Sequence, residues 1–240
     1  MSFLSRAPVP AWPLAGPADD GPGNPWISWR YLHDNAGALL SALEYHAGLT
    51  ARAVIFALIV ALPLAVVAYW VRPLTGPILA LSGILYTIPS LALLALVAPA
   101  VGTTTDTSVL IALVLYALLV LVRNALAGLT SVPAEVRDAA AGMGYGKLGR
   151  LWRIELPLAL PGIMTGLRLA TVSTVALVTV GSLIGKGGLG DLILGGFRNN
   201  FYKAQILAAA VLCVVLALVL DLLLAGLTRL LTPWARERRS

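Results

Sequence analysis

The sequence predicts an all-α membrane protein, and its composition and the grouping of its apolar residues carry that prediction. Of its 240 residues, 59% are hydrophobic and only 12% are charged, and the mean hydropathy is +0.88. A soluble domain has about 25% charged residues. The apolar residues also gather into stretches of about the 20 residues that a helix needs to cross a bilayer. These observations exclude a disordered chain and a collagen-like fibre, and the single cysteine, Cys213, excludes a disulfide-rich module.

The N-terminal segments have two different patterns. Residues 1–25 contain repeated prolines with scattered Gly and Asp, a composition that predicts a disordered tail. Residues 26–46 mix aromatic and aliphatic side chains with charged ones. That mixture is typical of an amphipathic helix lying at the membrane interface.

The rest of the chain predicts a transmembrane domain over residues 47–228, followed by a basic tail over residues 229–240. Pro89 lies inside the second apolar stretch, so we expect a broken helix there, which neighbouring helices can accommodate. The five apolar stretches cover residues 50–71, 76–100, 108–129, 161–184 and 204–227.

The net charge of +6 has two interpretations, which the positions of the basic residues separate. In a soluble protein it would suggest a nucleic-acid partner. Here many of the basic residues fall in the Arg72 turn, the 123–157 connection and the C-terminal tail. Five spans place these segments on one side, which the positive-inside rule makes cytoplasmic. We therefore expect the N-terminus outside, the C-terminus inside, and no nucleic-acid partner.

The longest connection on that side, residues 131–157, predicts a short helix, a turn and a second amphipathic piece. Pro133 and Glu135 suit a helix start, and the alanines at 139–141 favour a helix. Glycines at 142, 144 and 146 then end it. A helix of small residues can pack closely on a cytoplasmic partner, so this segment is either a docking element or an ordinary loop.

The same connection resembles the EAA loop of ABC importer permeases. The match consists of Asp138-Ala139-Ala140, Gly144 and Ile154-Glu155-Leu156-Pro157, with Asp in place of the family's first Glu. The segments TIPSLALL (87–94) and IGKGGLGD (184–191) resemble the branch that imports quaternary-amine osmoprotectants: glycine betaine, choline, carnitine or proline betaine. The resemblance covers roughly residues 46 to 225. It implies the MetI-like type I importer permease fold, with about five transmembrane helices and an N-terminal interfacial helix.

The resemblance also implies partners and roles. Two cytoplasmic ATPase subunits would dock on the loop, an external or periplasmic binding protein would deliver substrate, and a second permease copy or a sister permease would complete the pore. ATP and Mg would belong to the ATPase, so we expect no cofactor, metal or catalytic residue on this chain. The implied ATPase-coupling residues are Asp138, Ala139, Ala140, Gly144, Ile154, Leu156 and Pro157.

Polar or kinking residues inside the spans are candidates for two further roles. Arg168 and Asp221 lie at equal depth, about 10 Å from the cytoplasmic end at about 1.5 Å per residue, so we expect an ion pair that stabilises packing. A set in the second and third spans is the candidate translocation path. Its tyrosines can attract a quaternary ammonium through their ring faces, or they can simply pack. The set is Tyr86, Pro89, Ser90, Tyr116 and Asn124.

The glycine-rich stretch 185–190 does not have the G-x-x-x-x-G-K-[ST] spacing of a phosphate loop. It predicts a turn into an external half-helix, either as a gate, as a contact for the binding protein, or as a plain turn.

Three alternative functions remain open. A methionine-type amino-acid permease shares the EAA loop and a GGLGD-like segment, but not TIPSLALL. An intramembrane enzyme would need HExxH, GxSxG or paired carboxylates, which do not occur in the spans. A channel would not need the EAA-spaced loop.

Overall fold

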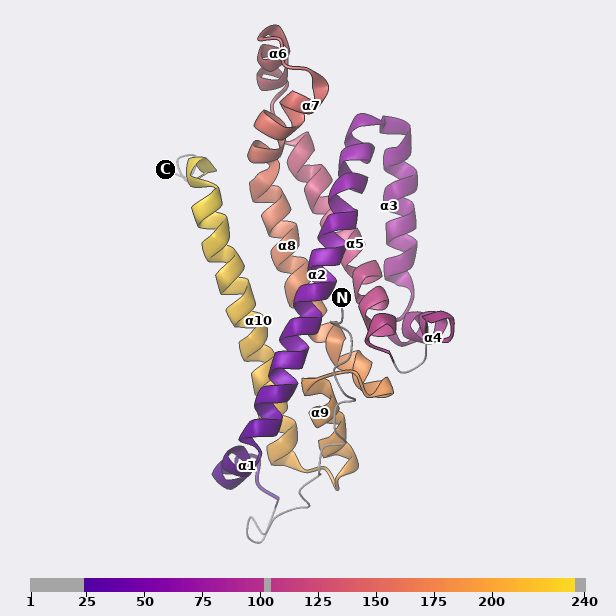
Figure 1. Ribbon diagram of the computed structural model, residues 1–240, viewed down its shortest axis with the longest axis vertical. Coiled ribbons are helices and arrows are strands. Elements are labelled where there is room, and N and C mark those ends of the chain that lie inside the picture. The colour runs from indigo at the N-terminus through magenta and orange to yellow at the C-terminus, as the bar shows by residue number, and fades with distance from the viewer. Residues whose placement is uncertain (1–23, 102–104, 236–240) are drawn as a thin grey trace, which may run out of the picture.

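The computed structural model describes residues 24–101 and 105–235, and every regular element in those ranges is a helix (Figure 1). The all-α prediction is therefore confirmed. Most of the predicted N-terminal tail and the end of the basic tail lie outside the described residues. The elements are α1 (Trp29–Asp34), α2 (Ala36–Trp70), α3 (Arg72–Thr87), α4 (Ser90–Val101), α5 (Asp106–Thr130), α6 (Ala134–Gly142), α7 (Lys147–Arg150), a π-helical turn η1 (Leu151–Glu155), α8 (Leu156–Val178), a 3-10 turn η2 (Thr179–Ile184), α9 (Leu189–Arg198), α10 (Lys203–Leu231) and a 3-10 turn η3 (Pro233–Ala235).

Four helical stretches are long and apolar enough to cross a membrane: Ala36–Trp70, Asp106–Thr130, Lys147–Ile184 and Lys203–Leu231. Helices α3 and α4 form a fifth if counted as one broken span, since they meet at a bend of 98°. Pro89 lies between them, where a proline has no N–H to continue the helical ladder. Four of the five predicted spans thus correspond to single helical stretches, and the second corresponds to the bent pair, with the predicted break at Pro89.

The predicted interfacial helix over residues 26–46 is not a separate element. Helix α1 is short, and α2 begins at Ala36 and continues through residue 46 to Trp70. The physical reason is that one buried face crosses the expected boundary: Leu39, Ala42, His46 and Leu49 continue the stripe that later contains Ala53 and Ala57. Because these positions recur every three or four residues, one straight helix buries them all.

Small residues hold the centre of the molecule together. Alanines 53, 57, 61 and 65 of α2 are fully buried, and α2 packs on α5 and α8. Between α5 and α8 the backbones approach so closely that a Cβ added at Gly162 would lie 2.8 Å from the Cα of Gly128. One added at Gly166 would lie 2.5 Å from Cβ of Asn124. Small residues permit this approach in membrane helix pairs, where van der Waals contact replaces the hydrophobic effect.

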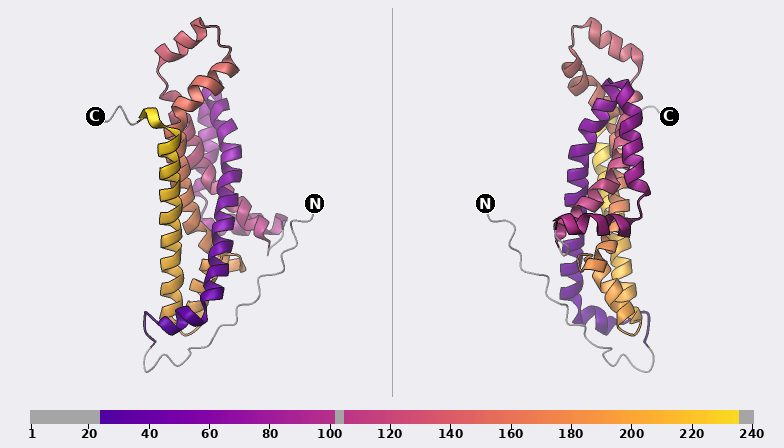
Figure 2. Two further views of the ribbon diagram at one scale, coloured as in Figure 1. Left: turned by 60° about the vertical axis from the view of Figure 1, so that its left-hand side comes forward. Right: turned by 90° about the vertical axis from the view of Figure 1, so that its right-hand side faces the viewer.

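The two ends of the molecule differ. Helices α6 and α7 project beyond the bundle at one end, where the α2–α3 turn and the C-terminal end of α10 also lie (Figures 1 and 2). Helices α1 and α9 lie at the opposite end (Figure 1). The segments richest in Arg and Lys are therefore at one end, as the five-span interpretation requires.

Helix α10 is tied to α8 by charge as well as by packing. Arg168 of α8 donates from Nε to Oδ1 of Asp221 at 2.8 Å and from Nη2 to Oδ2 at 2.7 Å. The equal depth inferred from the sequence thus brings the two side chains together in a bidentate pair. Planar guanidinium and carboxylate groups gain both strength and fixed orientation from this arrangement.

We expect Arg168→Met and Asp221→Leu each to lower the unfolding temperature in lipid nanodiscs, because either change leaves one charge in apolar surroundings. The double variant Arg168→Met/Asp221→Leu should recover most of that loss. Thermal unfolding followed by tryptophan fluorescence measures both effects. A double variant no more stable than the weaker single variant would contradict a packing role for the pair.

Gly166→Ala should lower the free energy of unfolding by about 1–3 kcal/mol, because the new Cβ overlaps Asn124 and the two backbones must separate. Gly226→Ala on α10 is the matched control, since nothing lies within 4 Å of the Cβ it would add. Denaturant titration of both variants in the same detergent gives the comparison. Equal stability of the two variants would show that the α5–α8 approach is not tight.

Candidate functional site

Helix α6 and the turn after it form a compact projection built from small residues. Glu135 lies in the first turn of α6, where a carboxylate favours the positive end of the helix dipole. After Gly142 the chain turns back: the N–H of Tyr145 donates to the carbonyl of Ala140 at 3.1 Å. Gly144 has a φ of +84°, in the left-handed region that favours glycine. The helix, the turn and the second piece expected from the sequence are all present.

The seven coupling residues expected from the resemblance divide into two groups. Asp138, Ala139 and Gly144 are exposed on the projection, whereas Ala140 is fully buried within it. The other group lies where η1 joins α8, and its side chains are half-buried: Ile154, Leu156 and Pro157. The first group can meet another molecule, while the second belongs to the junction with the span.

The segment from α6 to η1 also presents large apolar side chains that sequence reasoning did not put forward as site residues. Met143 is 69% exposed, Leu148 64% and Trp152 66%. Several large apolar side chains exposed in one short segment fit a protein interaction site. Met143 gives no periodic signal in the sequence because it lies in the turn, outside either helix.

Two polar contacts connect the projection to the spans. Arg137 of α6 donates from Nη1 to the hydroxyl of Tyr69, near the end of α2, at 3.1 Å. Arg150 of α7 donates from Nε to Oε1 of Glu155 at 2.8 Å. The Glu155 side chain is fully buried, and its Oε2 has no hydrogen-bond partner among the described residues. Sequence reasoning missed both contacts. The first has no local signal, since Tyr69 and Arg137 are 68 positions apart.

Four of the five candidate path residues meet at the α3–α4 bend. The Tyr116 hydroxyl of α5 donates to the carbonyl of Ile88 just before Pro89. The rings of Tyr86 and Tyr116 pack edge to face, with centroids 5.8 Å apart. Ser90 begins α4 on the other side of the bend. The tyrosines thus hold the bend by ring packing and by a hydrogen bond to a carbonyl beside the proline.

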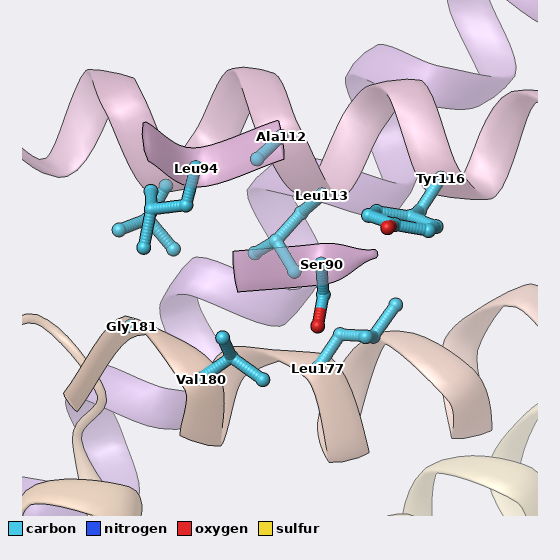
Figure 3. Close-up of a pocket in the computed structure, with 9 residues that line it drawn as sticks. Ser90, Leu94, Ala112, Leu113, Tyr116, Leu177, Val180 and Gly181 are labelled. Carbon is cyan, nitrogen blue, oxygen red and sulfur yellow. The ribbon is translucent and has the colours of Figure 1, made fainter. Parts of the chain in front are cut away.

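The bend lies beside a small open hollow (Figure 3). Ser90 and Tyr116 line it, and their hydroxyls are the polar side-chain groups there. Asn124 lies apart from it: its amide donates to the carbonyl of Val120 at 2.8 Å, and its Cβ faces Gly166. The structure therefore does not group Asn124 with the other four. The remaining lining residues are Leu94, Val109, Ala112, Leu113, Leu177, Val180 and Gly181.

The glycine-rich turn at the other end is closely packed and polar. A Cβ added at Gly187 would lie 2.4 Å from the backbone N of Ser182, so only glycine fits. The carboxylate of Asp191 accepts from the N–H of Gly187 at 3.1 Å; burial nevertheless raises the pKa of this carboxyl. Lys186 reaches Asp106 of α5 with an N–O distance of 3.2 Å, and the Tyr45 hydroxyl of α2 donates to the same carboxylate at 3.0 Å. The turn therefore joins three helical segments.

Within residues 24–101 and 105–235, no group of three or more His, Cys, Asp or Glu side chains could hold a metal ion.

Comparison with known proteins identifies the family of this chain. Residues 49–237 match the family described as binding-protein-dependent transport system inner membrane component. The chain is 35% identical to the glycine betaine/carnitine/choline transport system permease protein of Bacillus subtilis (strain 168) over 87% of its length and 90% of the relative's. It is 38% identical to the osmoprotectant import permease protein of Salmonella typhimurium (strain LT2) over 85% and 96%.

Solved structures support the same fold. The MetNI methionine ABC transporter, solved in inward facing conformations, superimposes with a TM-score of 0.76 at 21% identity, covering 86% of this chain and all of that one. Its likeness shows the fold alone. With the family match over most of the chain, the conclusion is that this protein belongs to the inner-membrane components of binding-protein-dependent transport systems.

Proposed function

We propose that this chain is the transmembrane permease subunit of an ATP-driven importer of quaternary-amine osmoprotectants, such as glycine betaine, choline, carnitine or proline betaine. The observation that carries the proposal is the α6–α7 loop, which projects from the bundle (Figure 2). This loop has exposed apolar side chains and EAA-like spacing. Relatives named for glycine betaine/carnitine/choline transport and for osmoprotectant import match the chain over 85–87% of its length, which supports the substrate class.

In this proposal the end carrying α6 and α7 is cytoplasmic, because the segments richest in Arg and Lys lie there. Two ATPase subunits dock on the loop, and ATP with Mg is bound by them and not by this chain. A binding protein delivers substrate at the opposite end, near α1 and α9. A second permease copy or a sister permease completes the pore. The binding protein and the ATPase can shift the permease between its outward-open and inward-open states only if they bind one of those states more tightly than the other.

The hollow at the α3–α4 bend suits a transit point better than a tight binding site. Ser90 and Tyr116 offer hydroxyls, and the other lining side chains are apolar. A quaternary ammonium carries methyl groups on a delocalised positive charge, so an aromatic face attracts it without a fixed ion pair. Weak contacts of this kind let the substrate leave. Substrate selection then belongs mainly to the binding protein.

Gly144→Val should weaken association with the ATPase roughly five- to thirtyfold, because a branched residue at a φ of +84° strains the turn after α6 by about 1–2 kcal/mol. Gly142→Val is the matched control: it adds the same side chain two positions away, where nothing lies within 4 Å. Co-purification of the ATPase with each membrane-inserted variant measures the effect. Equal retention by both variants would contradict a docking role for this turn geometry.

Reconstitution with the binding protein and the ATPase tests the substrate class. Glycine betaine, choline or carnitine should stimulate ATP hydrolysis in liposomes, and methionine should not. Omitting the binding protein is the control, and it should abolish the stimulation. Stimulation by methionine alone would replace this proposal with an amino-acid permease, whereas solute flux without ATP hydrolysis would indicate a channel.

A further inference from the structure

Arg137 connects the projecting loop to α2, a span that is not adjacent to the loop in the chain. The backbone of α6 lies beside α7 and η1, but the Arg137 side chain crosses to the last turn of α2 and bonds to Tyr69. The side chain is half-buried. A hydrogen bond from a guanidinium is among the stronger polar contacts, so it fixes the position of α6 against α2.

Glu155 offers Arg137 a second partner. Its buried carboxylate is bonded to Arg150 through Oε1 only, and Oε2 is unpartnered among the described residues. Buried polar atoms are rarely left without a partner, because the missing hydrogen bond costs free energy. The bond to Tyr69 raises the pKa of Arg137, and the charge of Glu155 raises it further. Helix α6, which carries Arg137, also contacts η1, which carries Glu155, so a small shift of α6 can bring the two groups together.

We propose that Arg137 is a positioning residue with two alternative partners: Tyr69 on α2 in the state described here, and Oε2 of Glu155 when α6 shifts toward the root of α8. The proposal rests on the proposed function, in which the ATPase moves α6. Each state gives the guanidinium one hydrogen-bonded partner, so the two states can be close in free energy, as a switching element requires. Docking motion would then release α2 while tightening the loop on α8.

The test follows the position of α6 in the full chain in lipid nanodiscs. Spin labels are attached at Gly142→Cys on α6 and Gly76→Cys on α3, in a Cys213→Ala background. Both glycines are exposed, and nothing lies within 4 Å of an added Cβ at either. In the otherwise unaltered chain without the ATPase, we expect mainly a short distance between the two labels. We expect a longer distance when the ATPase and a non-hydrolysable nucleotide are bound.

Tyr69→Phe and Glu155→Gln should act in opposite directions. Tyr69→Phe removes the acceptor on α2 and should raise the ratio of long to short distances roughly five- to tenfold without nucleotide. Glu155→Gln keeps an oxygen for Arg150 but removes the charge, and should retain the short distance even with nucleotide. Arg123→Gln is the control, because Arg123 is exposed and has no partner among the described residues.

Transport gives a second readout with Arg137→Gln. This variant should keep the ATPase bound and hydrolysing while substrate uptake per ATP falls roughly tenfold, the loss expected for a contact to a charged group. Shifts of Tyr69→Phe and Glu155→Gln in the same direction, or no shift in either, would overturn the two-partner proposal. A longer distance in Tyr69→Phe, in a chain that never binds an ATPase, would retain the two positions of α6 and reject the proposed function instead.

Discussion

Close approach between helix backbones is the constraint on which the rest of this structure depends. Inside a bilayer the surrounding lipid is as apolar as the side chains, so burial alone gives helices little reason to associate. Here the α5–α8 contact allows no Cβ at Gly128, Gly162 or Gly166 without a shift of neighbouring atoms. The alanine stripe of α2 packs on the same pair. These contacts convert three apolar helices into one unit from which the loop and the bent pair project.

That constraint has a mechanical consequence, because the loop is inserted between the two helices that pack most closely. Helix α5 ends at Thr130, immediately before the loop, and α8 begins at Leu156, immediately after it. The Cβ that Gly128 lacks would meet the carbonyl of Ala159 at 2.7 Å, so the tight contact begins at the root of the loop. Close-packed interiors shift between discrete arrangements instead of deforming smoothly. In the proposed function, a displacement of α6 would therefore reach the spans as a change in this contact and in the polar contacts beside it.

The sequence predicted what depends on composition and local pattern, and it missed what depends on contacts between distant segments. Hydropathy was sufficient for the spans, Pro89 for the break, and helix rise for the depth of Arg168 and Asp221. The same reasoning began the first span too far along the chain, because polar residues such as Glu44 interrupt the apolar pattern. The buried stripe of α2 continues across that boundary. Asn124 was grouped with Tyr116 by polarity, yet it faces Gly166. The Arg137–Tyr69 contact has no local signal at all.

Ion pairs join segments at the two ends of the molecule, whereas the side chains that line the hollow at the α3–α4 bend include no ionised group. At one end Lys186 and Asp106 join the glycine-rich turn to α5, and at the other Arg150 and Glu155 join the loop to α8. The hollow at the α3–α4 bend has hydroxyls and apolar side chains. An ionised group in the hollow would hold a charged substrate tightly and raise the barrier to its release. In the proposed importer, ion pairs at the two ends could break and re-form between conformational states without holding the substrate.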